Sequence, residues 1–279
     1  MKKLLLSLCA TLLLLSPCVA ADLPKGVTLR PDVAYGADPA QRMDVYLPPH
    51  PQRAPILLMV HGGAWRVGDK NDARVVDNKV ARWVPKGVIF VSVDYRMMPE
   101  AEPLTQAEDV AEALAKVQAL APGWGGDPAN IILMGHSAGA HLVALLTAAP
   151  ALATGQGAKP WKGSVLLDSG ALDVPAIMNA RHWPLYDRAF GSDPAKWTAV
   201  SPMDRLAGPT LPMLAVCRNG AHESCPANRA FAARARQLGG RVEVLPMALS
   251  HSQINERLGL PGGYTDRVEA FMRELGWAL

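Results

Sequence analysis

Residues 135–139 read Gly-His-Ser-Ala-Gly, which places one serine between two glycines. Serine in this spacing is typical of a nucleophile that forms an acyl intermediate. The apolar run 131–134 precedes it and the apolar run 142–146 follows it, so the pattern predicts a buried strand, a tight turn and a buried helix. Only small residues fit two positions on either side of such a turn. We therefore predict that Ser137 is a nucleophile exposed at the end of a sheet.

A serine hydroxyl is a weak nucleophile at neutral pH and needs a general base to accept its proton. His251 is the only histidine beyond residue 222, and it follows the predicted strand 242–245. When nucleophile, acid and histidine come in that chain order, the base lies after the last strand. We predict His251 as the base.

A serine nucleophile also requires hydrogen-bond donors for the oxyanion of the tetrahedral intermediate. The predicted strand 56–60 runs directly into His61-Gly62-Gly63-Ala64-Trp65. Paired glycines allow backbone N–H groups to face a cleft without side chains in the way. We expect Gly63 and Ala64, together with the Ala138 N–H after the serine, to form the oxyanion hole.

These motifs together resemble the α/β-hydrolase superfamily, and most closely its esterase and kynurenine-formamidase-like branch, which carries H-G-G-x-W. The resemblance covers about residues 40–275 and implies a mostly parallel central sheet, helices on both faces and a small cap. It also implies the roles given above for Ser137, His251 and the oxyanion donors, and a structural role for Asp94-Tyr95-Arg96 beneath the oxyanion turn. Further residues that match the branch are Gly126-Asp127-Pro128, Ser201-Pro202, Ser250-His251 and Ile254-Asn255.

The acid is the point at which this sequence departs from the branch, whose members usually carry an Asp after the strand corresponding to 213–217. Here the loop 218–226 contains no Asp, and Glu223 is its only carboxylate. We therefore predict Glu223 as the acid, with Asp168 and Asp173 after the preceding strand as alternatives. A bridge between Cys217 and Cys225 would close this loop and hold Glu223 near His251.

The first twenty residues have the pattern of a signal peptide: Lys2 and Lys3, a leucine-rich stretch at 4–15, and Cys18-Val19-Ala20 before the cleavage site. We expect a periplasmic or secreted protein in which Cys217 and Cys225 form a disulfide, the alternative being two buried thiols. No later stretch reaches 18 apolar residues, so we expect no integral membrane segment after signal removal.

Residues 21–279 are expected to form one domain, because apolar runs alternate with helical stretches without a linker or repeat. An irregular, aromatic-rich segment at about 169–212 is expected to be a cap over the pocket. A helix with a buried face of Val110, Ala113, Leu114 and Val117 is expected, and two more at 228–238 and 265–275. The predicted strands are 43–47, 56–60, 88–93, 131–134, 164–167, 213–217 and 242–245.

Composition excludes several other functions. The formal charge is +3 and there is no basic run, so no nucleic-acid partner is expected. Metal-ligand spacing and a phosphate-loop motif are both missing, so we expect no metal and no cofactor. The sequence predicts an exported serine hydrolase that cleaves small carboxylic esters, with no oligomeric state specified. The alternatives are an aryl-formamide hydrolase and a non-catalytic binding protein on the same scaffold.

Overall fold

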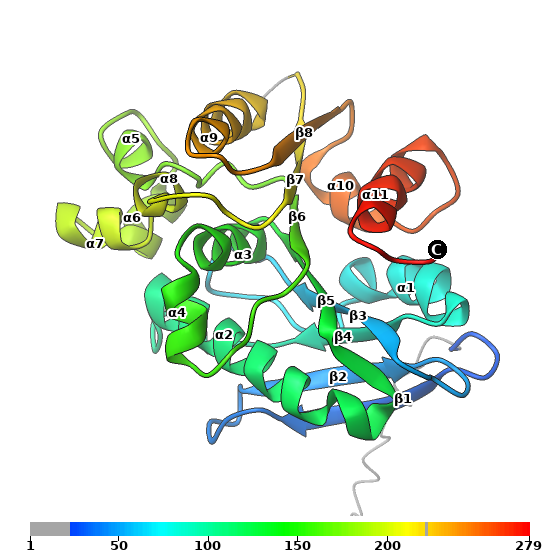
Figure 1. Ribbon diagram of the computed structural model, residues 1–279. Coiled ribbons are helices and arrows are strands. Elements are labelled where there is room, and N and C mark those ends of the chain that lie inside the picture. Colours follow the sequence, from blue (N-terminus) through cyan, green and yellow to red (C-terminus); the bar gives the residue numbers. More distant parts are fainter. Residues whose placement is uncertain (1–22, 221–222) are drawn as a thin grey trace, which may run out of the picture.

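The computed structural model describes residues 23–220 and 223–279, in which eight strands form one mixed sheet (Figure 1). The predicted signal peptide lies outside the described residues. The sheet has the order β1-β2-β4-β3-β5-β6-β7-β8. The strands are β1 (Thr28–Ala34), β2 (Arg42–Leu47), β3 (Ala54–Val60), β4 (Ile89–Val93), β5 (Gly126–His136), β6 (Gly163–Leu167), β7 (Met213–Arg218) and β8 (Val242–Met247).

The sheet is mostly parallel, as predicted. Strands β4, β3, β5, β6, β7 and β8 pair in parallel, and only β1 and β2 pair antiparallel to their neighbours. All seven predicted strands occur. Strand β1 was not predicted, because most of its side chains are exposed and it therefore lacks an apolar run.

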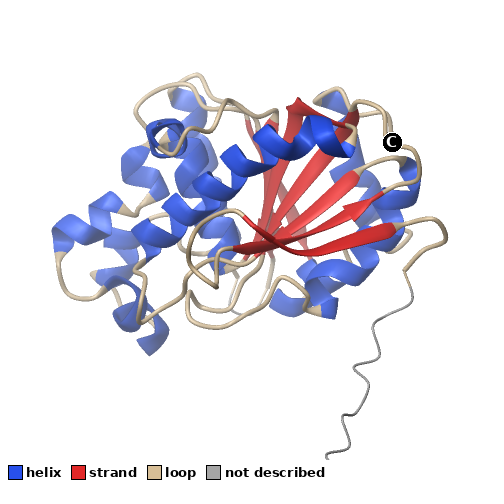
Figure 2. Cartoon of the chain, turned by 90° about the horizontal axis from the view of Figure 1, so that it is seen from below, coloured by secondary structure: helices blue, strands red, loops and turns tan. Residues whose placement is uncertain are grey.

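Helices cover both faces of the sheet, and Figure 2 shows the strands fanning through the middle with helices on either side. Alternate residues of β3 face the two covers: Ile56 and Leu58 join one apolar cluster, and Leu57 joins the other. One cover consists of α1 (Ala73–Trp83), α10 (His251–Glu256) and α11 (Gly263–Glu274). The other consists of α2 (Pro103–Leu120), α3 (Ala138–Ala148), α4 (Pro150–Gly155) and α9 (Cys225–Gln237). Short 3-10 helices follow α1 and α2 at Val84–Lys86 and Ala121–Trp124.

The predicted helices occur close to their expected bounds. The four predicted positions on the buried face of α2 are fully buried. Helix α3 is buried along its whole length, which explains its nearly continuous apolar sequence.

The segment between β6 and β7 folds into four short helices: α5 (Val174–Met178), α6 (Pro184–Phe190), α7 (Pro194–Ala199) and α8 (Pro202–Arg205). Each has a proline in its first turn, where the missing N–H costs no helical hydrogen bond. Phe190 of this segment packs against Trp65 in the loop after β3, with the two ring centroids 4.9 Å apart. The predicted insertion is therefore helical and packed.

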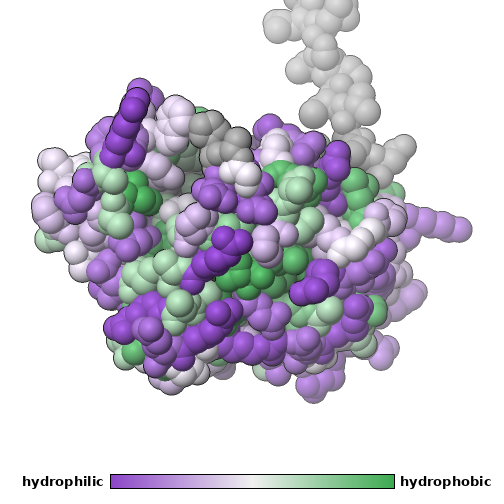
Figure 3. Space-filling model, turned by 90° about the horizontal axis from the view of Figure 1, so that it is seen from above, coloured by the Kyte–Doolittle hydropathy of each residue, from purple (hydrophilic) through white to green (hydrophobic). Residues whose placement is uncertain are grey.

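The face of the molecule in Figure 3 shows apolar areas separated by hydrophilic ones. Among the described residues, no helix is both long and apolar enough to cross a membrane. In the part of the chain that the structure describes, the large apolar side chains that are exposed are Leu23, Leu29, Val67, Trp183, Leu185 and Leu260. Three of these six, Val67, Trp183 and Leu185, line one large cavity, which is described below.

Candidate active site

Ser137 occupies the predicted turn between the end of β5 and the start of α3. Its backbone has φ 54° and ψ −117°, a strained conformation for a residue with a side chain. A Cβ atom at Gly135 would lie 2.3 Å from the Gly139 carbonyl oxygen, and one at Gly139 would lie 2.3 Å from the Val60 oxygen. The glycines of the pentapeptide are therefore required by close backbone contacts, and the elbow geometry holds Ser137 at the edge of the sheet.

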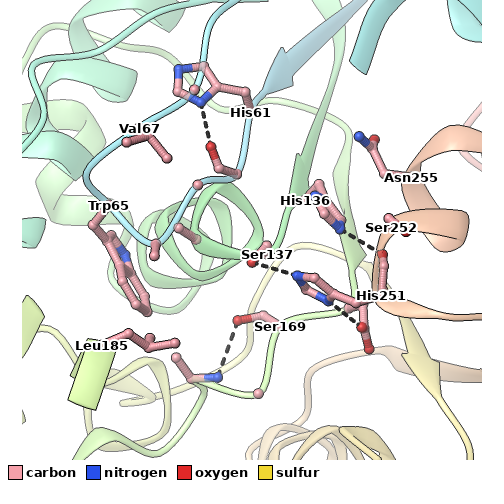
Figure 4. Close-up of a pocket in the computed structure, with 18 of the residues that line it drawn as sticks. His61, Trp65, Val67, His136, Ser137, Ser169, Leu185, His251, Ser252 and Asn255 are labelled. Atoms are coloured by element: carbon pink, nitrogen blue, oxygen red, sulfur yellow. Dashed lines mark hydrogen bonds and ion pairs between the residues drawn. The ribbon is translucent and has the colours of Figure 1, made fainter. Parts of the chain in front are cut away.

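His251 is the first residue of α10, directly after the Ser250 cap of that helix. Its Nε2 atom lies 2.9 Å from Ser137 Oγ. The capping box formed by Ser250 and Gln253 sets the direction in which α10 starts. His136 donates from Nε2 to the His251 carbonyl oxygen at 3.0 Å. The structure therefore brings the predicted nucleophile and base together in the expected contact (Figure 4).

The other end of α10 is held by α1. Lys79 is 1 % exposed, and its Nζ donates to the Asn255 carbonyl oxygen at 2.8 Å and to Asn255 Oδ1 at 2.9 Å. Burial lowers the pKa of this amine to about 7, and no carboxylate of a described residue forms an ion pair with it. Asn78 also donates to the Glu256 carbonyl oxygen. The helix that carries His251 is thus anchored at both ends.

The carboxylate that contacts His251 is Asp168, and the prediction of Glu223 for this place is wrong. Asp168 Oδ2 lies 2.6 Å from His251 Nδ1. Glu223 lines the same cavity, but its side chain is exposed and has no hydrogen bond or ion pair with another described residue. Asp173, the other alternative, caps α5 by accepting from the Ala176 amide.

The physical reason lies in the strand order. Asp168 directly follows β6, which lies between β5 and β7 in the sheet. The Ser137 amide donates to the Leu167 carbonyl oxygen at 2.9 Å, so the end of β6 lies beside the elbow. Adjacent parallel strands end at the same edge, and Asp168 therefore reaches His251 from a position one strand earlier than the resemblance implies.

The loop after β7 supplies donors to Asp168 in place of a carboxylate. Ser224 Oγ and the Arg218 amide both donate to Asp168 Oδ1, and the Arg218 guanidinium lies 3.6 Å from Oδ2. Burial by itself would raise the pKa of Asp168, but the hydrogen bonds from His251 and Ser224 outweigh it and hold that pKa below its ordinary value. Asp168 is therefore ionised at neutral pH.

Ser224 and Arg218 were not predicted, because neither belongs to the expected motif. Their only signal in the sequence is proximity to the cysteines. Cys217 and Cys225 are joined in a disulfide, as predicted, which closes the loop on which both donors lie. The bridge holds Ser224 against Asp168, not Glu223 against His251.

Gly63, Ala64 and Ala138 line the cavity beside Ser137. The amides of Arg66 and Val67 both donate to the Gly63 carbonyl oxygen, closing a turn after β3. Within the described part of the chain, no backbone carbonyl accepts from the amide of Gly63 or Ala64. Ala138 opens α3, so its N–H is among those with no partner inside the helix. Three amides are thus available beside one hydroxyl.

The residues beneath this turn have the predicted structural role. Tyr95 Oη donates to the His61 carbonyl oxygen at 3.1 Å, and its ring stacks on His61 at 4.6 Å. Trp65 donates to His141 Nδ1 at 3.1 Å, while His141 Nε2 donates to the Val200 carbonyl oxygen at 2.7 Å. His141 is therefore a packing residue that joins the oxyanion turn to the helical insertion.

A cavity of about 980 Å³ opens above Ser137. Its walls come from the loop after β3, from the insertion through Trp183, Leu185 and Tyr186, and from α10. Among the described residues there is no cluster of three or more His, Cys, Asp or Glu side chains that could hold a metal ion.

Comparison with known proteins finds similarity to esterases over parts of this chain. Residues 43–157 match the BD-FAE family model. The probable isoprenylcysteine alpha-carbonyl methylesterase ICME of Oryza sativa subsp. japonica is 35% identical over 113 residues, 40% of this chain and 27% of the relative. Esterase LipQ of Mycobacterium tuberculosis is 29% identical over 226 residues, 75% of this chain and 53% of the relative. The chain thus spans about a quarter to a half of these relatives.

Solved structures share the whole fold at low sequence identity. Apo Thermogutta terrifontis esterase 2 superposes with a TM-score of 0.72 and 21% identity, covering 93% of this chain and 98% of that one. Esterase B from Lactobacillus Rhamnosis (HN001) gives a TM-score of 0.72 and 18% identity, covering 91% and 86%. The fold of this chain is that of these esterases.

Proposed function

We propose that this chain, which has the α/β-hydrolase fold, is a serine hydrolase that cleaves carboxylic esters through an acyl-enzyme. The observation that carries the proposal is the continuous contact from Ser137 Oγ through His251 to Asp168, at 2.9 Å and 2.6 Å. The names of the relatives support ester bonds as the target.

In the first half-reaction, Ser137 Oγ attacks the ester carbonyl while His251 Nε2 accepts the hydroxyl proton. Asp168 accepts a hydrogen bond from His251 Nδ1–H, which fixes the tautomer in which Nε2 is free to act as a base, and stabilises the imidazolium that forms. His251 then gives the proton to the leaving alcohol. In the second half-reaction, water attacks the acyl group by the same route and releases the carboxylic acid.

The oxyanion of each tetrahedral intermediate requires donors that are already in place. The amides of Gly63, Ala64 and Ala138 supply them, since they line the cavity beside Ser137 without backbone partners. His136 stays neutral next to the charged imidazolium, because burial and the neighbouring His251 lower its pKa to about 3. His136 therefore adds no positive charge beside the imidazolium.

The two alternatives are less well supported. A formamide hydrolase would use the same residues, but the curated relatives described above are named as esterases. A non-catalytic binding protein would be favoured by the lack of an Asp after β7, but Asp168 Oδ2 lies 2.6 Å from His251 Nδ1, which supports a catalytic site.

The test is labelling with a fluorophosphonate probe, which reacts with activated serines. Thermogutta terrifontis esterase 2, whose fold this chain shares, has been solved phosphonylated by sarin. We expect the wild type to be labelled and to hydrolyse p-nitrophenyl acetate, and Ser137→Ala to lose both. Ser192→Ala, at an exposed serine of the insertion, is the matched control and should retain both. Labelling that survives in Ser137→Ala would refute the proposal.

We also propose that the protein is exported. The proposal rests on the pattern of residues 1–20 and on the buried disulfide, which persists best in an oxidising compartment. Expression with the native leader, followed by N-terminal sequencing of the mature protein, should give a chain that starts at Ala21 or Asp22. An uncleaved protein in the cytoplasm would contradict it.

A further inference from the structure

A second groove lies directly beside the large cavity, on the outer side of the oxyanion turn. Its volume is about 300 Å³, and it is lined by Ala64, Arg66, Met98, Pro99, Leu185 and Arg188. Ala64 and Leu185 also line the cavity above Ser137, so the two spaces adjoin. A molecule bound at Ser137 can therefore extend into the groove.

The groove carries two arginines that form no ion pair with another described residue. The guanidinium groups of Arg66 and Arg188 have no hydrogen bond or ion pair with another described residue, and no carboxylate is among the lining residues. Two unpaired guanidinium groups in one groove attract an anion and can hold a carboxylate in bidentate fashion.

The position of the groove indicates which part of the ester reaches it. In Figure 4, Leu185 and Trp65 lie on the opposite side of Ser137 from His251. His251 must give its proton to the leaving alcohol, so the alcohol leaves on the His251 side and the acyl group extends away from it. The acyl group therefore points toward Leu185 and the groove beyond it.

We propose that this groove is an anion subsite, and that the preferred substrates are half-esters of short dicarboxylic acids, whose free carboxylate binds Arg66 and Arg188. The apolar side chains of Met98, Pro99 and Leu185 contact the methylene groups between the two carboxyl carbons. The inference rests on the proposed esterase function and names its substrate class.

The test compares p-nitrophenyl hydrogen glutarate with its neutral counterpart, methyl p-nitrophenyl glutarate, as the ratio of kcat/KM within each protein. We expect the wild type to favour the anionic ester about tenfold, the magnitude of one or two solvent-exposed charge-assisted hydrogen bonds. The double variant Arg66→Met/Arg188→Met should bring the ratio to about one. Arg30→Met, an exposed arginine on the edge strand β1, is the matched control and should keep the wild-type ratio.

A ratio of one or less in the wild type would overturn the proposal, and so would a ratio that survives in the double variant. A second pair, 4-acetoxybenzoate and its methyl ester, places the charge on the leaving group. We expect its ratio to be insensitive to both arginines, and a response of this pair alone would refute the assignment to the acyl side. Failure of both glutarate esters to react with Ser137 would instead refute the esterase function, and the subsite with it.

Discussion

Replacing Asp168 by asparagine tests the largest difference between the predicted and the observed site. The change preserves shape and removes the charge. Every described neighbour of the carboxylate is a donor: Ser224 Oγ–H and the Arg218 amide on Oδ1, and His251 Nδ1–H on Oδ2. An asparagine has one oxygen and one NH₂ group, so its NH₂ must face one of these donors.

The less costly arrangement places the asparagine oxygen at the Oδ1 position, where it keeps two donors, and turns the NH₂ toward His251. The histidine must then accept at Nδ1 and carry its proton on Nε2, which faces Ser137 Oγ. In that tautomer it cannot accept the serine proton. We expect kcat to fall about 10⁴-fold, equivalent to about 5 kcal/mol of transition-state stabilisation.

The assay is hydrolysis of p-nitrophenyl acetate at pH 7.5, with circular dichroism to confirm that each variant is folded. Glu223→Gln is the matched control, and we expect its kcat to stay within about twofold of the wild type, since that carboxylate is exposed and unpaired with any described residue. A loss in Glu223→Gln as large as that in Asp168→Asn would refute the reasoning. So would a folded Asp168→Asn that keeps most of its activity.

Three further predictions concern stability. Gly139→Ala places a Cβ 2.3 Å from a carbonyl oxygen of β3 and should lower the free energy of unfolding in urea by about 1–3 kcal/mol. Gly123→Ala, where a Cβ would meet nothing within 4 Å, should leave that free energy unchanged. Equal effects of the two variants would contradict the close contact. Burial lowers the pKa of Lys79 to about 7 from 10.5, so the unfolded chain binds more protons between these values and the free energy of unfolding should rise with pH. The rise from pH 7 to pH 9 should be about 2 kcal/mol and should disappear in Lys79→Met; an unchanged slope in that variant would show that another group is responsible. Cys217→Ala/Cys225→Ala opens a loop of eight residues and should lower the free energy of unfolding, measured in urea, by about 2.5 kcal/mol. A change near zero would indicate that the loop is ordered without the disulfide.

The two groups that donate hydrogen bonds to Asp168 Oδ1 cannot be predicted from the sequence. Ser224 and Arg218 act through a hydroxyl and a backbone amide, neither of which forms a recognisable motif. The sequence offers Asp168 as an alternative, but the resemblance places the acid after β7 and therefore favours Glu223. The choice between them depends on which loop end lies nearer His251, and spacing along the chain does not encode that distance.

Residue order is sufficient to predict strands β2 to β8, the tight turn at Ser137, the position of His251 after the last strand and the pairing of Cys217 with Cys225. These features depend on local requirements, such as apolar runs for buried strands and glycines for a tight turn. Such requirements can be recognised from neighbouring residues in the sequence. Only the fold shows that Asp168 is the carboxylate beside His251, and only the fold forms the second groove, whose two arginines have no ion pair with a described residue. Both depend on the order of strands in the sheet and on how the insertion packs, which bring together residues far apart in the chain. Features that form within one turn or one strand can therefore be predicted from this sequence, whereas contacts between side chains of different loops depend on the fold.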